Sequence, residues 1–492
     1  CPAMERSKER GGGRGLAGPE LGSGAPGLSL RRGLGRGSTV ALVAGCMIGS
    51  GIFMSPQGVL VHVGSPGASL MVWVLCGTLG ALCYAELGAL VPSSGREHAY
   101  ILRAFDPLPA FLVSYASVLV GLPAAIVTIS LSFVEYAVAP FHPGCPPPRA
   151  AVKGMAATCV LLLALANCRT LWLIPFVTNI LLGRYLFYFL SSFPSRSFKL
   201  SENDSCQSCS LCPLSWLKGH HSAQLLGKGS QFYCSFFGFP SFLNLCWLTR
   251  SLSSPMRQWD LVWAMMIAIP LVTGLYLLVN FSYLLVLSPP EQARRAGQGC
   301  HWRHQLLGAW AWLVPGAVAL STFGSAKGTL FSGSRVCCVA AREGHMPQLQ
   351  SVVHVRRLTP APALPFTAAG AVALIVPGDF GAIVNLSFLA WLTHGTTVSC
   401  LLYLRMKNQD LPRSYKVPTF VPVTVLLASA YLVLAPIIDH PQGEVLYVFM
   451  FLLGGFAYFL LIHSQRQPGC LRTATLHLQL LLEVAPTTRV CT

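Results

Sequence analysis

The sequence predicts an all-α polytopic membrane protein, and three observations support this fold class. Only 10% of the 492 residues are Asp, Glu, Lys or Arg, whereas a soluble domain usually carries about 25%. Hydrophobic residues make up 53% of the chain, and its mean hydropathy is +0.57. The apolar residues form long runs, and a helix needs about 20 such residues to cross a bilayer. This composition also excludes an intrinsically disordered chain.

The apolar runs predict about twelve transmembrane helices within a transporter-sized domain at 38–465. The fifth and sixth runs are the least clearly defined. The expected spans are 39–63, 67–92, 108–139, 151–168, 172–193, 231–248, 261–287, 306–334, 363–377, 382–404, 419–438 and 443–463.

The positive charge predicts the orientation of these spans. The chain has 34 Lys and Arg against 17 Asp and Glu, and cytoplasmic loops carry an excess of basic residues. Most basic residues fall on one side if the Gly/Arg-rich tail 1–37 and the C-terminal tail 466–492 are both cytoplasmic. The positive net charge of the chain is then explained by the orientation of the spans and by attraction of the basic residues to anionic lipid. We therefore expect the lipid bilayer and no nucleic acid as a partner.

The first span contains the motif Gly49-Ser50-Gly51. Glycine lowers the cost of unwinding a helix, and unwound backbone at membrane depth is tolerated where it lines a cavity. The exposed N–H groups of a broken helix suit a carboxylate, as in transporters with inverted repeats. Close helix packing through small residues is the alternative interpretation. From these residues alone, both interpretations stay open.

Further motifs resemble those of one family, the light subunits of heteromeric amino-acid transporters in the amino acid–polyamine–organocation superfamily. Among these subunits, the chain is most similar to the cystine/dibasic exchanger and its aromatic-preferring relatives. The similarity covers about 38–168 and 243–485, whereas 169–242 matches poorly. The matching motifs are Gly49–Phe53, GALCYAELG at 80–88, PFHPGC at 140–145, AREGHMP at 341–347, RRLTPAP at 356–362, KVP at 416–418 and LHLQLLLEV at 476–484.

The resemblance implies a LeuT-like fold with two five-helix inverted repeats, and sodium-independent amino-acid exchange by alternating access at the plasma membrane. By position, Ser50 and Gly51 would offer backbone N–H groups to the substrate carboxylate. Gly238 stands where a dibasic-selective member would carry a carboxylate, so we expect neutral substrates, aromatic or cystine-like ones included. The substrate-binding residues implied are Cys46, Met47, Ile48, Gly49, Ser50 and Gly51, with Phe237 and Gly238 from the sixth span.

The resemblance also implies a protein partner. Cys145 stands where the family places an extracellular cysteine that forms a disulfide to a single-span type II glycoprotein heavy chain. Its Pro-rich loop is expected on the outer side, where disulfides persist. A free thiol in this loop is the alternative.

Two basic residues inside predicted spans depart from the family pattern, namely Arg184 and Lys327. Lys327 stands where the family prefers Asn, and it is either a functional cation or a tolerated or damaging substitution. We hypothesise that 169–242 derives from altered or non-homologous coding sequence. The alternative function is therefore a transport-inactive membrane scaffold that pairs with a heavy chain.

Other signals point away from an enzyme, a cofactor or a metal. The chain has no P-loop, hydrolase or metalloprotease motif. Glu86 and Glu97 are expected to be structural or gating charges, and the apolar run 476–484 is expected to form a cytoplasmic helix docked on the bundle or on the membrane surface. Zinc-like spacing links Cys206, Cys209 and Cys212 to His220 and His221, but disulfides or free thiols are the favoured interpretation in that loop.

Overall fold

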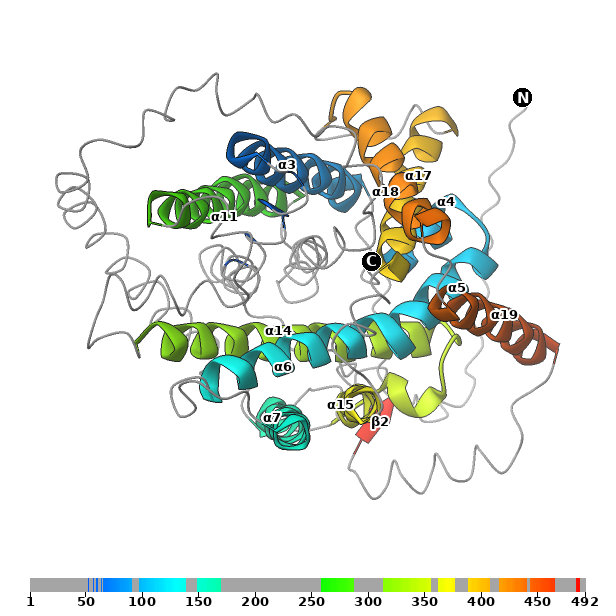
Figure 1. The fold of residues 1–492 in the computed structure, drawn as a ribbon. Helices are drawn as coiled ribbons and strands as arrows, with labels where there is room; N and C mark the ends of the chain where they lie inside the picture. Colours follow the sequence, from blue (N-terminus) through cyan, green and yellow to red (C-terminus); the bar gives the residue numbers. More distant parts are fainter. Residues whose placement is uncertain are drawn as a thin grey trace, which may run out of the picture.

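The structure is a computed structural model in which nearly all the described residues are helical (Figure 1). It describes residues 65–90, 97–138, 148–169, 258–286, 313–354, 362–376, 388–407, 416–439, 443–464 and 484–486, together with single residues between 52 and 63.

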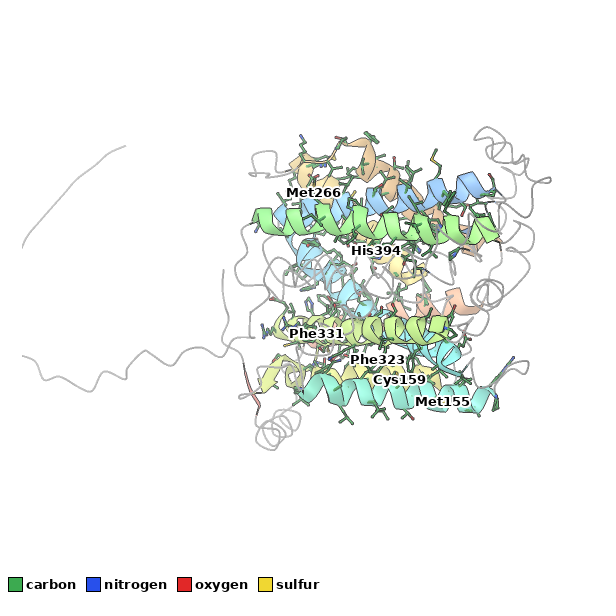
Figure 2. All side chains as sticks on the ribbon, turned by 90° about the vertical axis from the view of Figure 1, so that its left-hand side faces the viewer. Met155, Cys159, Met266, Phe323, Phe331 and His394 are labelled. Carbon is green, nitrogen blue, oxygen red and sulfur yellow. The ribbon has the colours of Figure 1, made fainter. Side chains whose placement is uncertain are left out.

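Two long apolar helices, α3 (Pro66–Leu90) and α11 (Gln258–Val286), lie side by side along one face of the bundle (Figures 1 and 2). Trp73 and Tyr276 join them, with ring centroids 5.0 Å apart. Helix α3 begins at Pro66, where the missing N–H of proline costs no helical hydrogen bond. Helix α11 contains Pro270 in its interior, which a membrane helix tolerates when its surroundings satisfy the freed carbonyl group.

A second layer is built on one continuous apolar stretch from Pro107 to Val138. It consists of α5 (Pro107–Ala116), a π-helical turn η1 (Ser117–Gly121) and α6 (Leu122–Val138). Helix α14 (Leu313–Arg342) packs along α6, and both contact α7 (Arg149–Arg169) and α15 (Ala363–Ile375) (Figure 1). A Cβ atom at Gly333 would lie 3.4 Å from Thr367 and 3.5 Å from Leu122, so glycine permits this close packing.

A third group of helices gathers around the ends of α3 and α5. The short helix α4 (Glu97–Ala104) contacts α5 and α17 (Phe388–Lys407), and α17 packs against α18 (Phe420–Asp439). Helix α19 (Gly443–Ser464) packs against α5 through a row of aromatic rings. Two of the polar contacts described below join α3 to α4 and α17, and a third joins α4 to the end of α14.

The predicted spans agree with the helices where the structure describes them. Within those residues, three helical stretches are long and apolar enough to cross a membrane, and they match the predictions 67–92, 108–139 and 151–168. Helices α11, α14, α15, α17, α18 and α19 overlap six further predicted spans, although α14 ends eight residues after its predicted span. The spans 172–193 and 231–248, and nearly all of 39–63, lie outside the described residues. The structure is thus a mostly helical, multi-pass membrane protein.

One prediction about the C-terminal tail is wrong at its end. Val484 does not belong to a docked helix, because Val484–Pro486 forms strand β2. This strand pairs antiparallel with β1 (Val352–His354), with Val353 opposite Ala485. Valine favours extended backbone. Strand β1, which follows the 3-10 helix η3 (Gln348–Ser351), supplies the hydrogen-bonding partners for the backbone of β2. Residues 476–483 lie outside the described residues.

Candidate functional site: buried polar contacts between the helices

The substrate site predicted from the sequence lies outside the described residues. This holds also for Arg184, for the heavy-chain cysteine Cys145 and for the Cys- and His-containing loop of Cys206, Cys209, Cys212, His220 and His221. Among the residues that the structure describes, no group of three or more His, Cys, Asp or Glu side chains could hold a metal ion. The residues that remain predictions are Cys46, Met47, Ile48, Gly49, Ser50, Gly51, Phe237 and Gly238.

Lys327 lies inside α14, as the sequence predicted, and its exposed fraction is only 2%. Asn167 of α7 donates a hydrogen bond to the main-chain oxygen of Lys327 at 3.5 Å. Ala326, which precedes Lys327 in α14, belongs to the apolar core between α6, α7, α14 and α15. The ammonium group therefore belongs to the interior of the bundle and not to its lipid-facing surface.

The core beside Lys327 is apolar and partly aromatic. Phe323 of α14 meets Phe133 of α6 with ring centroids 5.9 Å apart. Two turns further along α14, the guanidinium carbon of Arg335 lies 4.6 Å from the ring centroid of Phe331. Figure 2 shows Cys159 of α7 next to this layer, whereas Met155 lies further out on the same helix and is exposed. The exposed apolar residues of α7 are suited to contact with lipid.

The first buried polar contact joins α3 to α17. Arg405 Nε donates to Glu86 Oε1 at 3.1 Å, and the guanidinium makes a second, very short contact with Oε2. The backbone N–H of Val417 donates to the same Oε2 at 2.9 Å, while the Val417 carbonyl accepts from Arg405 at 2.7 Å. This contact ties the ends of α3 and α17 to the segment that leads into α18. The sequence-based expectation of a structural or gating charge at Glu86 fits this arrangement.

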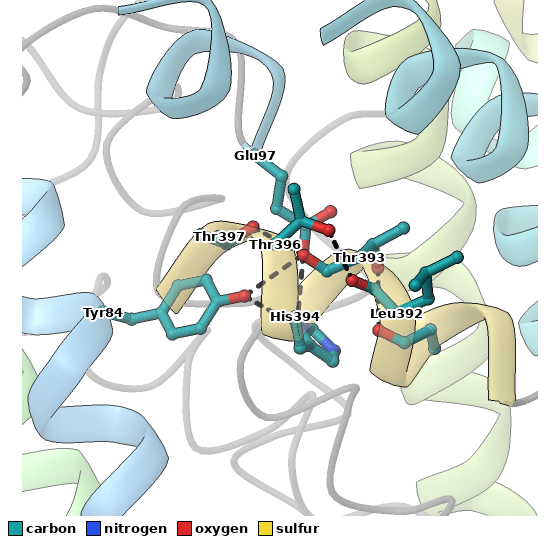
Figure 3. A network of polar contacts seen from close by, with 8 residues as sticks. Tyr84, Glu97, Leu392, Thr393, His394, Thr396 and Thr397 are labelled. Carbon is teal, nitrogen blue, oxygen red and sulfur yellow. Dashed lines mark hydrogen bonds and ion pairs between the residues drawn. The ribbon is translucent and has the colours of Figure 1, made fainter. Parts of the chain in front are cut away.

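The second polar contact joins α3, α4 and α17 (Figure 3). The Tyr84 hydroxyl lies 2.6 Å from His394 Nδ1 and 3.3 Å from Glu97 Oε1. His394 Nδ1 is itself 3.3 Å from Glu97 Oε1. All three side chains are buried, with exposed fractions of 4%, 2% and 3% for Tyr84, His394 and Glu97. We call these residues the Tyr84–Glu97–His394 cluster.

The third polar contact is a histidine pair at the end of α14. His98 of α4 and His345 have ring centroids 4.8 Å apart, and the His345 ring also meets Phe111 at 5.4 Å. Burial lowers the pKa of His98, against opposing effects of the Ala110 carbonyl and Glu343. Burial and the neighbouring His98 lower the pKa of His345 to about 4. Both imidazoles are therefore neutral at physiological pH.

A helix-ending motif positions His345. Gly344 has φ +82°, and its N–H donates to the Ala341 carbonyl at 3.2 Å. The His345 N–H donates to the Ala340 carbonyl at 3.0 Å. These two bonds form a Schellman motif, which satisfies the last carbonyls of α14 and turns His345 back toward α5.

Sequence reasoning singled out Glu86 and Glu97 but missed their partners. Arg405 lies 319 residues from Glu86, and His394 lies 310 residues from Tyr84. A usable signal was present: an ionisable residue in an apolar span almost always faces a partner or a cavity. Which residue serves as the partner follows only from the packing of α3, α4 and α17.

The apolar helices and the polar contacts buried between them are those of a polytopic membrane protein. The model of the family described as "Amino acid permease" matches residues 34–461. The chain is 39% identical over 467 residues to b(0,+)-type amino acid transporter 1 of Homo sapiens, covering 93% of this chain and 94% of that protein. It is 35% identical over 487 residues to Large neutral amino acids transporter small subunit 2 of Homo sapiens, covering 94% and 86%.

The chain belongs to the amino acid permease family. The mouse b(0,+)-type amino acid transporter 1 agrees, with 38% identity over 478 residues, which are 93% of this chain and 94% of that protein. The resemblance to light subunits of heteromeric amino-acid transporters is thereby confirmed. The family and these relatives are transporters and not enzymes, as the sequence motifs predicted.

Proposed function

We propose that the chain is the transport subunit of a heteromeric amino-acid exchanger, and that it exchanges neutral L-amino acids by alternating access without sodium. The observation that carries this proposal is the family match over residues 34–461, which includes the described helices from α3 to α18 and most of α19. Relatives at 39% and 35% identity are named as amino-acid transporters.

The substrate site that we propose is the unwound first span together with the sixth. Ser50 and Gly51 would bind the substrate carboxylate through their backbone N–H groups, because the positive end of a broken helix suits an anion. Cys46, Met47, Ile48 and Gly49 would line the same turn. Phe237 and Gly238 would face the substrate side chain, and the lack of a carboxylate there favours neutral substrates.

The proposed scaffold has twelve spans, of which the first ten form a LeuT-like inverted repeat. Both termini would lie in the cytoplasm, with the complex in the plasma membrane. The distribution of Lys and Arg supports this orientation, since basic residues favour cytoplasmic loops. The ends of α3 and α17, which meet at Glu86 and Arg405, would then lie on the cytoplasmic side.

The proposed partner is a single-span type II glycoprotein joined through Cys145. The name of one relative contains the words "small subunit", which supports a larger partner. On non-reducing gels, Cys145→Ser should lose a high-molecular-weight band that Cys159→Ala retains, because Cys159 is buried within α7. A band that persists in Cys145→Ser would contradict this link.

The test of transport is exchange in liposomes. The chain is reconstituted with a heavy chain, and uptake of radiolabelled leucine, phenylalanine and cystine is measured with and without internal amino acid. Uptake stimulated by internal amino acid, above that of empty liposomes, supports the exchanger. Gly51→Val should abolish it, whereas Gly454→Ala should not, because a Cβ atom at Gly454 meets open space.

The same assay addresses the transport-inactive scaffold, which Lys327 and the poorly matching segment 169–242 motivate. Absence of exchange in a folded, disulfide-linked complex would support the scaffold and overturn the exchanger. Lys327→Asn should leave exchange unchanged if the buried lysine is a tolerated substitution, and should lower exchange if its charge is functional.

A further inference from the structure

Exposed basic and apolar side chains meet where α17 ends and α18 begins. The two helices lie side by side, next to α4 (Figure 1). Met406 and Phe420, at these two helix ends, have exposed fractions of 78% and 67%. Lys407 follows Met406 in α17, Lys416 precedes α18, and both lysines are exposed. Large apolar side chains beside basic ones suit the boundary between the acyl chains and the headgroups of a bilayer.

Both lysines lie just outside the apolar runs of their helices. Lys407 is three residues past the run 382–404, and Lys416 is three residues before the run 419–438. The headgroup region of a bilayer lies directly outside its hydrocarbon core. The two ammonium groups are therefore at the level of the lipid phosphates, on the same side of the bundle.

Arg405 holds the two helix ends together without supplying a free charge. Its guanidinium donates to the Val417 carbonyl at 2.7 Å and to Thr419 Oγ1 at 3.4 Å. Its positive charge is balanced by Glu86 in the buried ion pair described above. The lysines on either side of this contact are thus kept close to each other, and the ion pair leaves their charges uncompensated.

Lys407 is positioned by an aromatic pair that joins α17 to α4. Its Nζ donates to the Tyr403 hydroxyl at 2.9 Å and lies 5.2 Å from the centroid of the same ring. Phe105, directly after α4, packs on the Tyr403 ring with centroids 5.1 Å apart. Tyrosine is common at the level of lipid headgroups. A lysine ammonium has three donors, so two of those of Lys407 stay available to a ligand.

The exposed charges around this contact are mostly positive. Arg103, in the last turn of α4, is exposed like the two lysines. Asp106, at the start of α5, is an exposed acid that acts electrostatically on Lys407. Among the residues that the structure describes, the side chains of Arg103 and Lys416 form no hydrogen bond or ion pair. The surplus of positive charge complements an anionic headgroup.

An apolar stripe leads away from these basic residues along α18. Phe420, Val423, Leu427 and Leu434 are all exposed. Their spacing of three, four and seven residues places them on one face of the helix. The stripe begins beside Lys416 and follows the helix into the membrane, as the acyl chain of a lipid does from its headgroup.

We propose that the ends of α17 and α18 form a binding site for an anionic phospholipid. Lys407 and Lys416 bind the headgroup phosphate, and Arg103 of α4 adds to the positive charge. The acyl chains lie over Met406 and along the apolar stripe of α18. In the proposed orientation, this lipid belongs to the cytoplasmic leaflet, which carries anionic lipids. The site rests on the membrane fold and not on the proposed function.

The test follows the midpoint of thermal unfolding of the purified full-length chain in a neutral detergent. Phosphatidylglycerol is added in steps, and phosphatidylcholine with the same acyl chains is added in parallel. The wild type is compared with the double variant Lys407→Gln/Lys416→Gln. Tyr403→Phe is one control, because it removes the hydrogen bond to Lys407 and keeps the lysine. Arg149→Gln is the other, because it removes an exposed basic residue at the start of α7.

The expected result follows from the preferential binding of lipid to the folded chain, which raises the thermal midpoint. Phosphatidylglycerol should raise the midpoints of the wild type, Tyr403→Phe and Arg149→Gln over the same concentration range. A basic residue near anionic lipid is worth about fivefold in affinity, so the double variant should need roughly 25-fold more. Phosphatidylcholine should not separate the proteins. A double variant that responds to phosphatidylglycerol like the wild type would overturn the site.

Two further measurements keep the outcome decisive. If the double variant does not fold, Lys416→Gln is used alone, and it must raise the required concentration of phosphatidylglycerol by about fivefold. An unchanged concentration would overturn the site. Glycerol phosphate, which has the phosphate without acyl chains, is added at the same concentrations. A midpoint shift as large as that with phosphatidylglycerol would identify a site for free anions and overturn the lipid. A wild type that responds equally to both phospholipids would overturn it as well.

Discussion

Arg405 of α17 holds Glu86 of α3 in a buried two-point ion pair, and the Val417 backbone bonds both side chains. The contact joins segments that lie 319 and 331 residues apart in the chain. Both oxygens of the Glu86 carboxylate accept hydrogen bonds, Oε1 from Arg405 and Oε2 from Arg405 and the Val417 N–H. A single interaction thus fixes the relative position of α3, α17 and the start of α18.

Removal of one partner from this pair is expected to destabilise the protein strongly. A buried charge left without its partner costs about 3–5 kcal/mol in proteins, so Glu86→Gln and Arg405→Gln should each lower the midpoint of thermal unfolding. Lys407→Gln is the control, since this residue is exposed and donates its hydrogen bond to Tyr403 of its own helix. Equal midpoints for Arg405→Gln and Lys407→Gln would contradict the structural role of the pair.

The helices could be predicted from the sequence because each apolar run carries its own signal. The runs at 67–92 and 108–139 exceed the roughly 20 residues that a bilayer requires, the run at 151–168 comes close to that length, and helices lie at all three. Arg405 and His394 could not be paired with Glu86 and Tyr84 in this way, since no local pattern records contacts across 310 residues or more. The strand at Val484 was missed for the same reason, because its partner strand begins at Val352.

The packing of α19 on α5 depends on glycine at one position. A Cβ atom at Gly455 would lie 2.9 Å from Tyr115 Cδ1 and 3.4 Å from Leu112 Cδ2. Tyr115 also stacks on Phe451 with ring centroids 4.7 Å apart, so its ring has little room to move. Gly455→Ala should therefore destabilise the protein by about 1–3 kcal/mol, the usual cost of overpacking.

The neighbouring residue supplies a matched control for this substitution. A Cβ atom at Gly454 meets nothing within 4 Å. Gly454→Ala should leave the protein unchanged or stabilise it by up to about 1 kcal/mol, because alanine favours the helix. The thermal midpoints of both variants are measured under the same conditions. A Gly455→Ala variant as stable as Gly454→Ala would show that α19 does not pack on Tyr115 as described.

Gly344 ends α14 in a conformation that other residues rarely adopt. Its φ of +82° allows the two hydrogen bonds that close the helix, and alanine at this position would cost about 1–2 kcal/mol. Gly344→Ala should lower the thermal midpoint accordingly. Gly154→Ala, within α7 and with nothing near a Cβ atom, should not. If both variants unfold at the same temperature, the Schellman motif does not hold the end of α14.

The His98–His345 pair predicts a loss of stability in mild acid. Burial lowers the pKa of both histidines in the folded protein, and that of His345 falls to about 4. In the unfolded chain, a histidine titrates near pH 6.5. Protonation therefore favours the unfolded chain, so the contribution of the pair is fully present above about pH 6.5 and is lost as pH falls toward 4.

The measurement is the thermal midpoint against pH for the wild type and for His345→Phe. Phenylalanine keeps an aromatic ring against Phe111 and removes the titrating group. The variant should lose less stability than the wild type between about pH 6.5 and pH 4. The two profiles should run parallel above that range, where His345 is neutral in both the folded and the unfolded wild type. A wild type whose midpoint falls no more steeply in acid than that of His345→Phe would mean that His345 is not buried against His98 and α5 in the folded protein.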